Sequence, residues 1–257
     1  MTETALDHIL DLPPKAEKPL IDYETVIIGS GICGIGAGIR MIKEGIGDFV
    51  ILEKADDVGG TWRDNTYPGL AVDIPSLSYS FSFEQNPNWS SLYAPGKEMK
   101  AYVDHCTQKY GIRPHMRYNE DVSESIYDEL NNVWITRTKA GNTYVSRYIV
   151  SATGFLTLPK LPLIKGIDKF EGKTIHTGRW DHDYDLSGKT VAVIGTGASA
   201  VQFVPEIAKQ VRQLLVFQRS PNYIMERKDR AYSGPELRLM QRFPWLTKLY
   251  RLQIFLN

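Results

Sequence analysis

The chain has 257 residues, of which 42% are apolar and 23% charged, as in an ordinary globular protein that can bury a core. Thirty basic residues balance thirty acidic ones, so the basic excess of a nucleic-acid-binding protein is missing. The two cysteines and five histidines show no metal-ligand spacing, and no apolar run reaches the roughly 18–20 residues of a membrane helix. We therefore expect no metal, nucleic acid or membrane partner, and a cytoplasmic location.

The N-terminal region leads into a strand–helix–strand unit. Residues 1–21 are acidic, contain Pro13-Pro14 and lack the features of a signal peptide, so we predict a flexible extension. Residues 25–29 form an apolar run that predicts a buried strand. A helix is expected next because isoleucines recur on one side of it until Gly45, and residues 48–53 read as a second strand.

The middle of the chain predicts a long ordered loop and a small antiparallel sheet. Residues 59–95 are rich in glycine, proline and aromatic residues, which is typical of a functional loop. A helix is expected near residues 97–110. Residues 122–148 alternate polar and apolar side chains, which predicts a meander leading into a strand at residues 148–154.

The remainder predicts a linker and a second strand–helix–strand unit. Proline-spaced residues from 158 onward indicate the linker. Residues 189–195 and 214–218 read as strands with a helical stretch between them. Residues from about 235 to 257 alternate basic and large apolar side chains and end without a helix-capping signal, so the chain looks interrupted there.

Two glycine-rich turns each follow an apolar strand and open a helix. The first is Gly29-Ser-Gly31-Ile-Cys-Gly34 and the second is Gly195-Thr-Gly197-Ala-Ser-Ala200. Such turns let the backbone approach a pyrophosphate, which the N–H groups at the start of the helix then bind. A single match is weak, but two in this context predict two dinucleotide-binding units.

The residues that end the second strand of each unit carry opposite charges. Glu53 lies 24 positions after Gly29, and Arg219 lies 24 positions after Gly195. A carboxylate at this place accepts hydrogen bonds from ribose hydroxyls, whereas an arginine attracts a 2′-phosphate. The first unit is therefore predicted to bind FAD and the second NADPH, unless Arg219 is simply a surface residue.

A segment before the second turn resembles a known fingerprint, FxGxxxHxxxW followed by Pro or Asp. Its fixed positions are Phe170, Gly172, His176, Trp180 and Asp181. This pattern is similar to that of the Baeyer–Villiger monooxygenases, and the resemblance covers nearly all of residues 22–235. Related flavin monooxygenases that oxidise sulfur or nitrogen usually carry another aromatic residue at the tryptophan position, and they remain an alternative. A non-catalytic FAD- and NADP-binding fragment that needs a partner chain is another.

The resemblance implies roles for individual residues. Asp73 would lie by the flavin and orient a catalytic arginine, and His176 would help to couple domain movement to cofactor binding. Trp62 and Tyr79 could instead be packing aromatics, and Arg63 and Arg179 are more simply solvated. The residues expected at FAD are Gly29, Gly31, Cys33, Gly34, Glu53, Thr61, Trp62, Arg63, Asp64, Asp73, Tyr79 and Val122. Those expected at NADPH are Thr196, Gly197, Ala198, Ser199, Ala200, Gln202, Arg219 and Ser220.

The implied fold class is α/β, with two Rossmann-like domains that are both incomplete. We predict an extension at 1–21, an FAD-binding part at 22–157 with the meander, a linker at 158–187 and an NADP-binding part at 188–257. The implied reaction uses FAD, NADPH and O2 to insert oxygen beside a ketone carbonyl through a flavin peroxide. Because family members are about twice as long, we expect a complementary C-terminal half that carries the arginine, and poor solubility without it.

Overall fold

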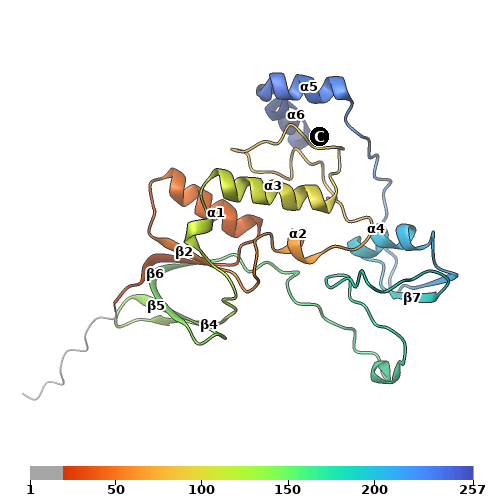
Figure 1. Ribbon diagram of the computed structural model, residues 1–257, viewed down its shortest axis with the longest axis horizontal. Helices are drawn as coiled ribbons and strands as arrows, with labels where there is room; N and C mark the ends of the chain where they lie inside the picture. The colour runs from red at the N-terminus through yellow and green to blue at the C-terminus, as the bar shows by residue number, and fades with distance from the viewer. Residues whose placement is uncertain (1–19, 257) are drawn as a thin grey trace, which may run out of the picture.

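The computed structural model describes residues 20–256, so the predicted extension lies outside the described residues except for its last two positions. A six-stranded sheet in the order β3-β2-β1-β6-β5-β4 supports the first half of the chain (Figure 1). The central strand β1 pairs in parallel with β2 and β6, while β4, β5 and β6 form an antiparallel meander. The strands span Tyr23–Ile28, Phe49–Leu52, Met116–Arg117, Val122–Asp128, Val133–Thr138 and Thr143–Ser151.

The predicted α/β fold is confirmed, with one difference in the meander. Residues 143–145 and 148–151, which we expected in separate strands, belong to one continuous strand, β6. Its first part pairs with β5 and its second part with β1, so a single strand joins the meander to the parallel strands. The short strand β3 was not predicted, because two residues are too few for a periodic pattern.

Helices α1 (Ile32–Lys43) and α3 (Gly96–Lys109) cover one face of this sheet (Figure 1). The predicted isoleucine stripe of α1 faces the core, since Ile35 and Ile39 are fully buried. The 3-10 helix η1 (Arg113–His115) follows α3. Helix α1 begins in the turn after β1, next to the carboxyl end of β2, where the Gly29 N–H donates to the Leu52 carbonyl at 2.8 Å.

The long loop at residues 59–95 is part of the core. It contains a short helix, α2 (Thr61–Asp64), and is otherwise irregular. Trp89 and Leu77 are each only 1% exposed. The Ser76 hydroxyl accepts a hydrogen bond from the Ala94 N–H at 2.7 Å, which joins the middle of the loop to its C-terminal end. Aromatic packing thus gives this segment order without regular secondary structure.

A second lobe contains the parallel strands β7 (Thr190–Ile194) and β8 (Gln213–Phe217) with the helix α4 (Ala198–Ile207). Its apolar cluster includes Phe203, Ile207 and Tyr67, and Tyr67 comes from the long loop. The linker between β6 and β7, which includes η2 (Ile167–Lys169), runs along an extended path below this lobe (Figure 1).

The last helices, α5 (Gly234–Arg242) and α6 (Pro244–Leu256), were not predicted as helices. Ser233 and Glu236 form a reciprocal capping box at the start of α5. Met240 and Tyr250 join the first core, and the Arg251 guanidinium donates to the Leu77, Ser78 and Ser80 carbonyls at 3.0, 3.2 and 2.8 Å. The two helices therefore pack against the core of the first half of the chain, whereas the sequence places them with the second unit.

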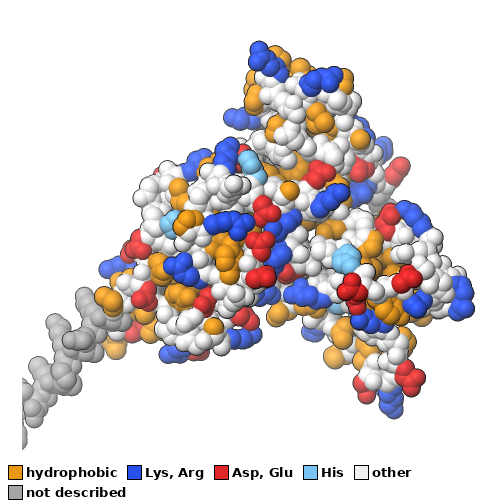
Figure 2. Space-filling model, in the orientation of Figure 1, with side chains coloured by type: hydrophobic (Ala, Val, Ile, Leu, Met, Phe, Trp, Pro, Cys, Tyr) orange, Lys and Arg blue, Asp and Glu red, His pale blue; other side chains and the backbone are white. Residues whose placement is uncertain are grey.

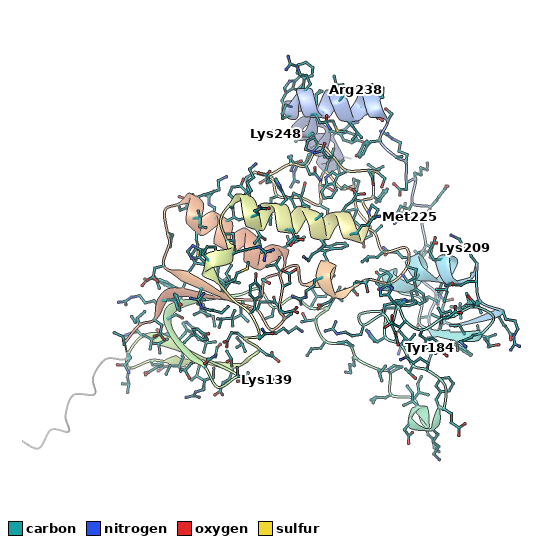
Figure 3. All side chains as sticks on the ribbon, viewed as in Figure 1. Lys139, Tyr184, Lys209, Met225, Arg238 and Lys248 are labelled. Carbon is teal, nitrogen blue, oxygen red and sulfur yellow. The ribbon has the colours of Figure 1, made fainter. Side chains whose placement is uncertain are left out.

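The segment between β8 and α5 carries the chain back from the second lobe. Figure 3 shows Met225 on this segment, with Arg238 and Lys248 on the helix pair beyond it. Ser91 and Ala231 form an isolated antiparallel bridge that attaches the segment to the long loop. Within residues 20–256, no helix is both long and apolar enough to cross a bilayer, and no cluster of three or more His, Cys, Asp or Glu could hold a metal ion.

Candidate functional site

The first glycine-rich turn is closely packed where the backbone must bend. Gly29 has φ +98°, and a Cβ on it would lie 2.6 Å from the Ala152 carbonyl oxygen. A Cβ on Gly34 would lie 1.9 Å from the Gly29 carbonyl oxygen. Gly31 is different, because only the Gly60 Cα, at 3.9 Å, comes near its Cβ position. The backbone is therefore closed behind the turn and accessible at Gly31.

The start of α1 has the properties of an anion-binding helix terminus. Gly31 is the N-cap residue, no side chain caps the helix, and the first turn contains no acidic residue. The first N–H groups of a helix have no partner within it and carry a partial positive charge. Cys33 lies in this turn and is exposed.

Glu53 follows β2 and is only 3% exposed, yet it is fully hydrogen-bonded. One carboxylate oxygen accepts from the Ser30 N–H at 2.9 Å and from the Ser30 hydroxyl at 2.6 Å. The other accepts from the Ala55 N–H at 3.0 Å and pairs with Arg63 at 3.0 Å. Burial alone would raise the pKa of Glu53, but the hydrogen bonds from Ser30 and Ala55 and the charge of Arg63 lower it overall. Glu53 is thus held as an anion.

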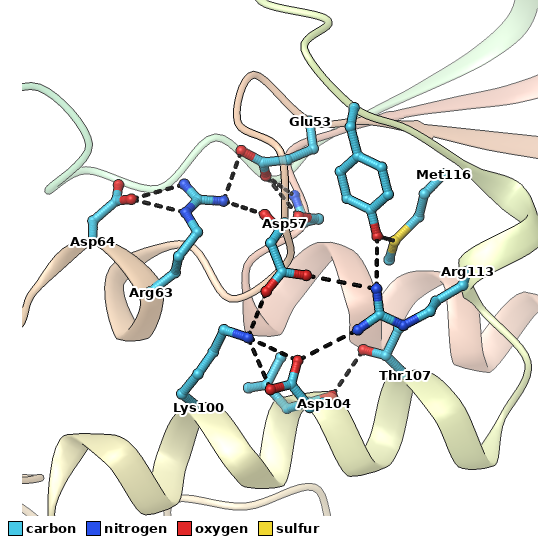
Figure 4. A network of polar contacts seen from close by, with 12 residues as sticks. Glu53, Asp57, Arg63, Asp64, Lys100, Asp104, Thr107, Arg113 and Met116 are labelled. Atoms are coloured by element: carbon cyan, nitrogen blue, oxygen red, sulfur yellow. Dashed lines mark hydrogen bonds and ion pairs between the residues drawn. The ribbon is translucent and has the colours of Figure 1, made fainter.

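Arg63 is not solvated, which corrects the simpler expectation from the sequence. Its side chain is 14% exposed and forms ion pairs with Glu53 and with Asp64, the latter at 2.9 Å (Figure 4). It also donates to the Asp57 carbonyl at 2.5 Å. Burial tends to lower the pKa of Arg63, but the neighbouring carboxylates raise it overall. The guanidinium therefore bridges the end of β2 and helix α2. Its positive charge is paired with the carboxylate of Asp64.

A second set of charges continues this network towards α3. Lys100 donates to Asp57 at 2.7 Å and to Asp104 at 2.8 Å, and Arg113 lies 3.6 Å from Asp57 (Figure 4). These residues were not predicted from the sequence, because the contacts of Lys100 and Arg113 with Asp57 join parts of the chain that are far apart in sequence. Burial would raise the pKa of Asp57, but its bond from Lys100 lowers it overall. The network fixes the loop that follows β2.

The aromatic residues of the long loop gather beside the first turn. The rings of Trp62 and Tyr79 meet edge to face with centroids 5.4 Å apart. Burial is the largest cause of the raised pKa of Tyr79, and the charges of Asp73 and Cys33 add to it. Asp73 itself is exposed and forms no ion pair or hydrogen bond within residues 20–256. The structure therefore brings Cys33, Trp62, Asp73 and Tyr79 together.

Two other residues expected at FAD lie in different settings. Thr61 is exposed at the start of α2. Val122 begins β4 and packs against the small apolar cluster of Val26, Val50 and Leu52. Nothing in the described contacts joins Val122 to the first turn.

The second glycine-rich turn has the same backbone form but more space around it. Gly195 has φ +101°, and no atom lies within 4 Å of a Cβ placed on Gly195 or Gly197. Helix α4 starts after Gly197 with no side-chain cap and no acid in its first turn, and Ala200 is buried. The Asn222 amide donates to the Thr196 carbonyl and hydroxyl oxygens at 2.6 and 3.1 Å. Asn222 was not singled out from the sequence.

Arg219 and Ser220 follow β8 and are both exposed. Arg219 forms no ion pair or hydrogen bond with any other residue that the structure describes. Ala198 is also exposed. Burial raises the pKa of Tyr67 overall, and a hydrogen bond with Ser199 opposes this rise. This end of the second lobe therefore offers a cation and hydroxyl groups to solvent.

Gln202, which is expected at NADPH, lies where the second lobe contacts the long loop. Its side-chain oxygen accepts from the Tyr67 hydroxyl at 3.2 Å and the Ala71 N–H at 3.3 Å, and its amide donates to the Ala71 carbonyl at 3.0 Å. A Cβ on Gly69 would lie 2.7 Å from the Gln202 carbonyl oxygen. Gln202 therefore fastens α4 to the long loop, so its amide is committed to the contact between the two lobes.

The fingerprint residues divide into a packed part and an exposed part. The centroid of the Trp180 ring lies 5.5 Å from that of Phe203 in the second lobe. His176 accepts a hydrogen bond from the Gly178 N–H at 3.0 Å, and its carbonyl accepts from the Arg179 N–H at 2.8 Å. Asp181 pairs with Lys173 at 2.5 Å.

The other end of the fingerprint is exposed. Phe170 is 62% exposed, and its ring lies beside Gly172, where a Cβ would be 2.5 Å away. Arg179 is half-exposed, as expected, and lies 3.6 Å from Asp64. The segment thus touches both the second lobe and the Arg63 network.

Comparison with known proteins agrees with this arrangement. The sequence profile of the pyridine nucleotide-disulphide oxidoreductase family matches residues 26–235. Baeyer–Villiger monooxygenases from Streptomyces coelicolor and Pseudomonas aeruginosa are 50% and 46% identical over 225 and 228 residues, which are 88% and 89% of this chain. The match covers 43% of each relative, so the chain spans less than half of their length.

Solved structures show the same relationship. Cyclohexanone monooxygenase from Rhodococcus, bound to NADP+, superposes with a TM-score of 0.80 at 34% identity over 87% of this chain and 43% of that one. The OTEMO complex with FAD and NADP gives a TM-score of 0.81 at 33% identity over 90% and 45%. The resemblance inferred from the fingerprint is therefore confirmed.

Proposed function

Because the chain belongs to the pyridine nucleotide-disulphide oxidoreductase family and matches the N-terminal part of Baeyer–Villiger monooxygenases, we propose that it forms the FAD- and NADPH-binding part of such an enzyme. One observation carries the proposal. Two glycine-rich turns of the same backbone form are each followed, at the same spacing, by a charged residue, which is a buried anion in Glu53 and an exposed cation in Arg219.

The first turn fits the adenosine and pyrophosphate part of FAD. Gly31 and the uncapped start of α1 leave room for phosphate oxygens, and the ionised Glu53 supplies an acceptor for ribose hydroxyls. Trp62, Tyr79 and Asp73 would lie along the flavin half. FAD supplies the redox and oxygen chemistry when bound, while these residues bind it, orient it and exclude water.

The second turn fits NADPH. Arg219 is free to pair with a 2′-phosphate, and the start of α4 offers N–H groups to the pyrophosphate. Thr196, Ala198, Ser199 and Ser220 surround this end of the lobe. Gln202 contributes through the contact between the lobes, since its amide is already bonded to Ala71.

A complementary C-terminal half would complete both units. Asp73 is an exposed carboxylate without a cation within residues 20–256, as a residue awaiting an arginine from elsewhere would be. Ile194 and Phe217 on β7 and β8 are 58% and 56% exposed. Figure 2 shows apolar side chains at the surface of this lobe. Large exposed apolar residues on a sheet mark a surface that another element covers.

The remaining parts of the proposal follow from this. The substrates of the completed enzyme would be a small ketone and O2, and the product an ester or lactone. The fingerprint segment would couple the two lobes through His176 and Trp180.

We place the enzyme in the cytoplasm, where its free thiols fit a reducing environment. We keep the domain limits 22–157, 158–187 and 188–257 as part of this proposal, with α5 and α6 packing against the core of the first half of the chain.

The test mixes the purified chain with FAD and then adds NADPH under air, with and without the part of the Streptomyces coelicolor relative beyond the match. We expect the chain alone to bind FAD. With the complement, NADPH should bleach the flavin, oxygen should restore it, and cyclohexanone should yield a lactone. The proposal would be contradicted if the Gly34→Ala chain formed as much lactone as the unaltered chain. It would also be contradicted if the complement bound but NADPH neither bleached the flavin nor led to product.

A further inference from the structure

Glu53 has no unused acceptor position. A carboxylate offers about four lone-pair sites, and the structure fills them with the Ser30 N–H, the Ser30 hydroxyl, the Ala55 N–H and Arg63. A ribose hydroxyl that donates to Glu53 must therefore replace one of these donors. The identity of the donor that leaves determines how the site binds its ligand.

The two backbone donors cannot leave. The Ser30 N–H belongs to the turn after β1, and the Ala55 N–H lies two residues after Glu53 itself. Moving either would disturb the strands that the Gly29 N–H joins by its bond to the Leu52 carbonyl at 2.8 Å. The choice is therefore between the Ser30 hydroxyl and the Arg63 guanidinium.

Arg63 is fixed on several sides. Besides Glu53, it bonds Asp64 through Nε and Nη2, each at 2.9 Å, and it donates to the Asp57 carbonyl. Asp57 is in turn held by Lys100 at 2.7 Å. Removing a buried guanidinium from two carboxylates is costly. The Ser30 hydroxyl, by contrast, can leave by rotation about a single side-chain bond.

We propose that Arg63 is a positioning residue that holds Glu53 in place for the ribose, and that the Ser30 hydroxyl is a placeholder that the ribose displaces. This inference rests on the proposed binding of FAD at the first turn. Arg63 would then act through Glu53 and would not touch the flavin. Its effect should be confined to ligands that carry ribose hydroxyls.

Arg63 also connects this carboxylate to the fingerprint segment. Asp64 bonds Arg63 with one carboxylate oxygen, and its other oxygen lies 3.6 Å from Arg179. A line of alternating charges thus runs from the end of β2 to the linker, through Glu53, Arg63, Asp64 and Arg179. A half-exposed pair such as Asp64–Arg179 is weak, so the main effect of Arg63 should lie at Glu53.

The experiment measures competition by ADP and by 2′,3′-dideoxy-ADP against FAD on the 257-residue chain, so that only the first site is read. In an Arg63→Gln variant we expect ADP affinity to fall about tenfold, the loss typical of one charge-assisted hydrogen bond, while dideoxy-ADP affinity stays unchanged. Arg63→Lys should recover part of the loss, because it restores the charge without the planar fork. Ser30→Ala should leave ADP affinity undiminished.

Arg113→Gln is the matched control, because Arg113 belongs to the same network but does not contact Glu53. It should leave both affinities unchanged. If Arg63→Gln weakens both ligands equally or neither, Arg63 is only structural and the inference fails. If Ser30→Ala weakens ADP as much as Arg63→Gln does, the placeholder role fails. If the unaltered chain binds no FAD, the proposed function itself fails. The dideoxy-ADP affinity also shows whether each variant keeps a folded first turn.

Discussion

The two glycine-rich turns share a backbone form but differ in how much of the protein surrounds them. The first lies in a six-stranded sheet under two helices, and its glycines leave no space for a Cβ at positions 29 and 34. The second lies on two strands, with nothing near Gly195 or Gly197. The motif therefore specifies the turn, whereas the surrounding sheet determines how rigidly the turn is held.

The charged residues show the same contrast. Glu53 is buried, has four donors and is kept ionised, whereas Arg219 is exposed and has no partner among the described residues. The charged residue of the first unit is thus held by other groups of the protein itself. The second has to gain its contacts from the ligand or from further protein. Changes at equivalent positions should therefore affect stability in the first unit and ligand binding in the second.

The largest effect is expected for Glu53→Gln. The change leaves the buried Arg63 charge short of one partner, which costs about 3 kcal/mol in buried ion pairs. Arg219→Gln, at the equivalent position, should leave stability unchanged. Urea unfolding of both variants measures the difference. A Glu53→Gln variant as stable as the unaltered chain would show that this ion pair does not hold the first unit together.

The same ion pair predicts a dependence on pH. Because the folded state lowers the pKa of Glu53 below 4.5, its stabilisation is present above that value and is lost as the pH falls through the folded pKa. The stability difference between the unaltered chain and Glu53→Gln should therefore shrink in acid. A difference that grows as the pH falls below 4.5 would mean that the sign of the pKa shift is reversed.

Alanine substitutions at one glycine of each turn are expected to have the next largest effect, and to differ between the two turns. Gly34→Ala places a Cβ 1.9 Å from a backbone oxygen and should cost about 1–3 kcal/mol by overpacking, with loss of FAD binding. Gly197→Ala meets no atom within 4 Å and should change stability little. Thermal unfolding and FAD titration of both variants check this pair. Equal destabilisation would remove the distinction between a closed and an open turn.

A smaller effect is expected for nucleotide preference in the second unit. Arg219→Gln should weaken NADPH binding about tenfold, because it removes one charge-assisted contact to the 2′-phosphate. NADH binding should stay the same, since NADH lacks this phosphate. Fluorescence titration with both nucleotides measures the ratio. A variant that loses affinity for both to the same extent would place Arg219 outside the 2′-phosphate site.

The smallest effect concerns the contact between the lobes. Tyr67→Phe removes the hydroxyl that donates to Gln202 at 3.2 Å and should cost about 1 kcal/mol, as for one neutral hydrogen bond. Hydrogen exchange of α4 should quicken, while exchange in α1 should not change. Faster exchange in both helices would mean that the lobes unfold as one unit and that the contact is not local.

Much of this arrangement could be predicted from local patterns. The glycine spacing and the isoleucine stripe of α1 concern residues within one or two turns of each other, and the structure agrees with them. The ion pair of Arg63 with Glu53 and the contact of Gln202 with Ala71, which lies across 131 positions, depend on tertiary packing, so local patterns do not predict them. Helix α5 could have been found from Ser233 and Glu236, which form a capping box.

The most direct test of the account is a titration of the 257-residue chain with FAD, followed by flavin fluorescence and absorption, beside Gly34→Ala and Gly197→Ala as paired variants. The account predicts that one FAD binds to the unaltered chain and to Gly197→Ala, and that Gly34→Ala binds none. No FAD binding by the unaltered chain, or equal binding by all three proteins, would contradict the claim that the first turn binds FAD without the complementary half.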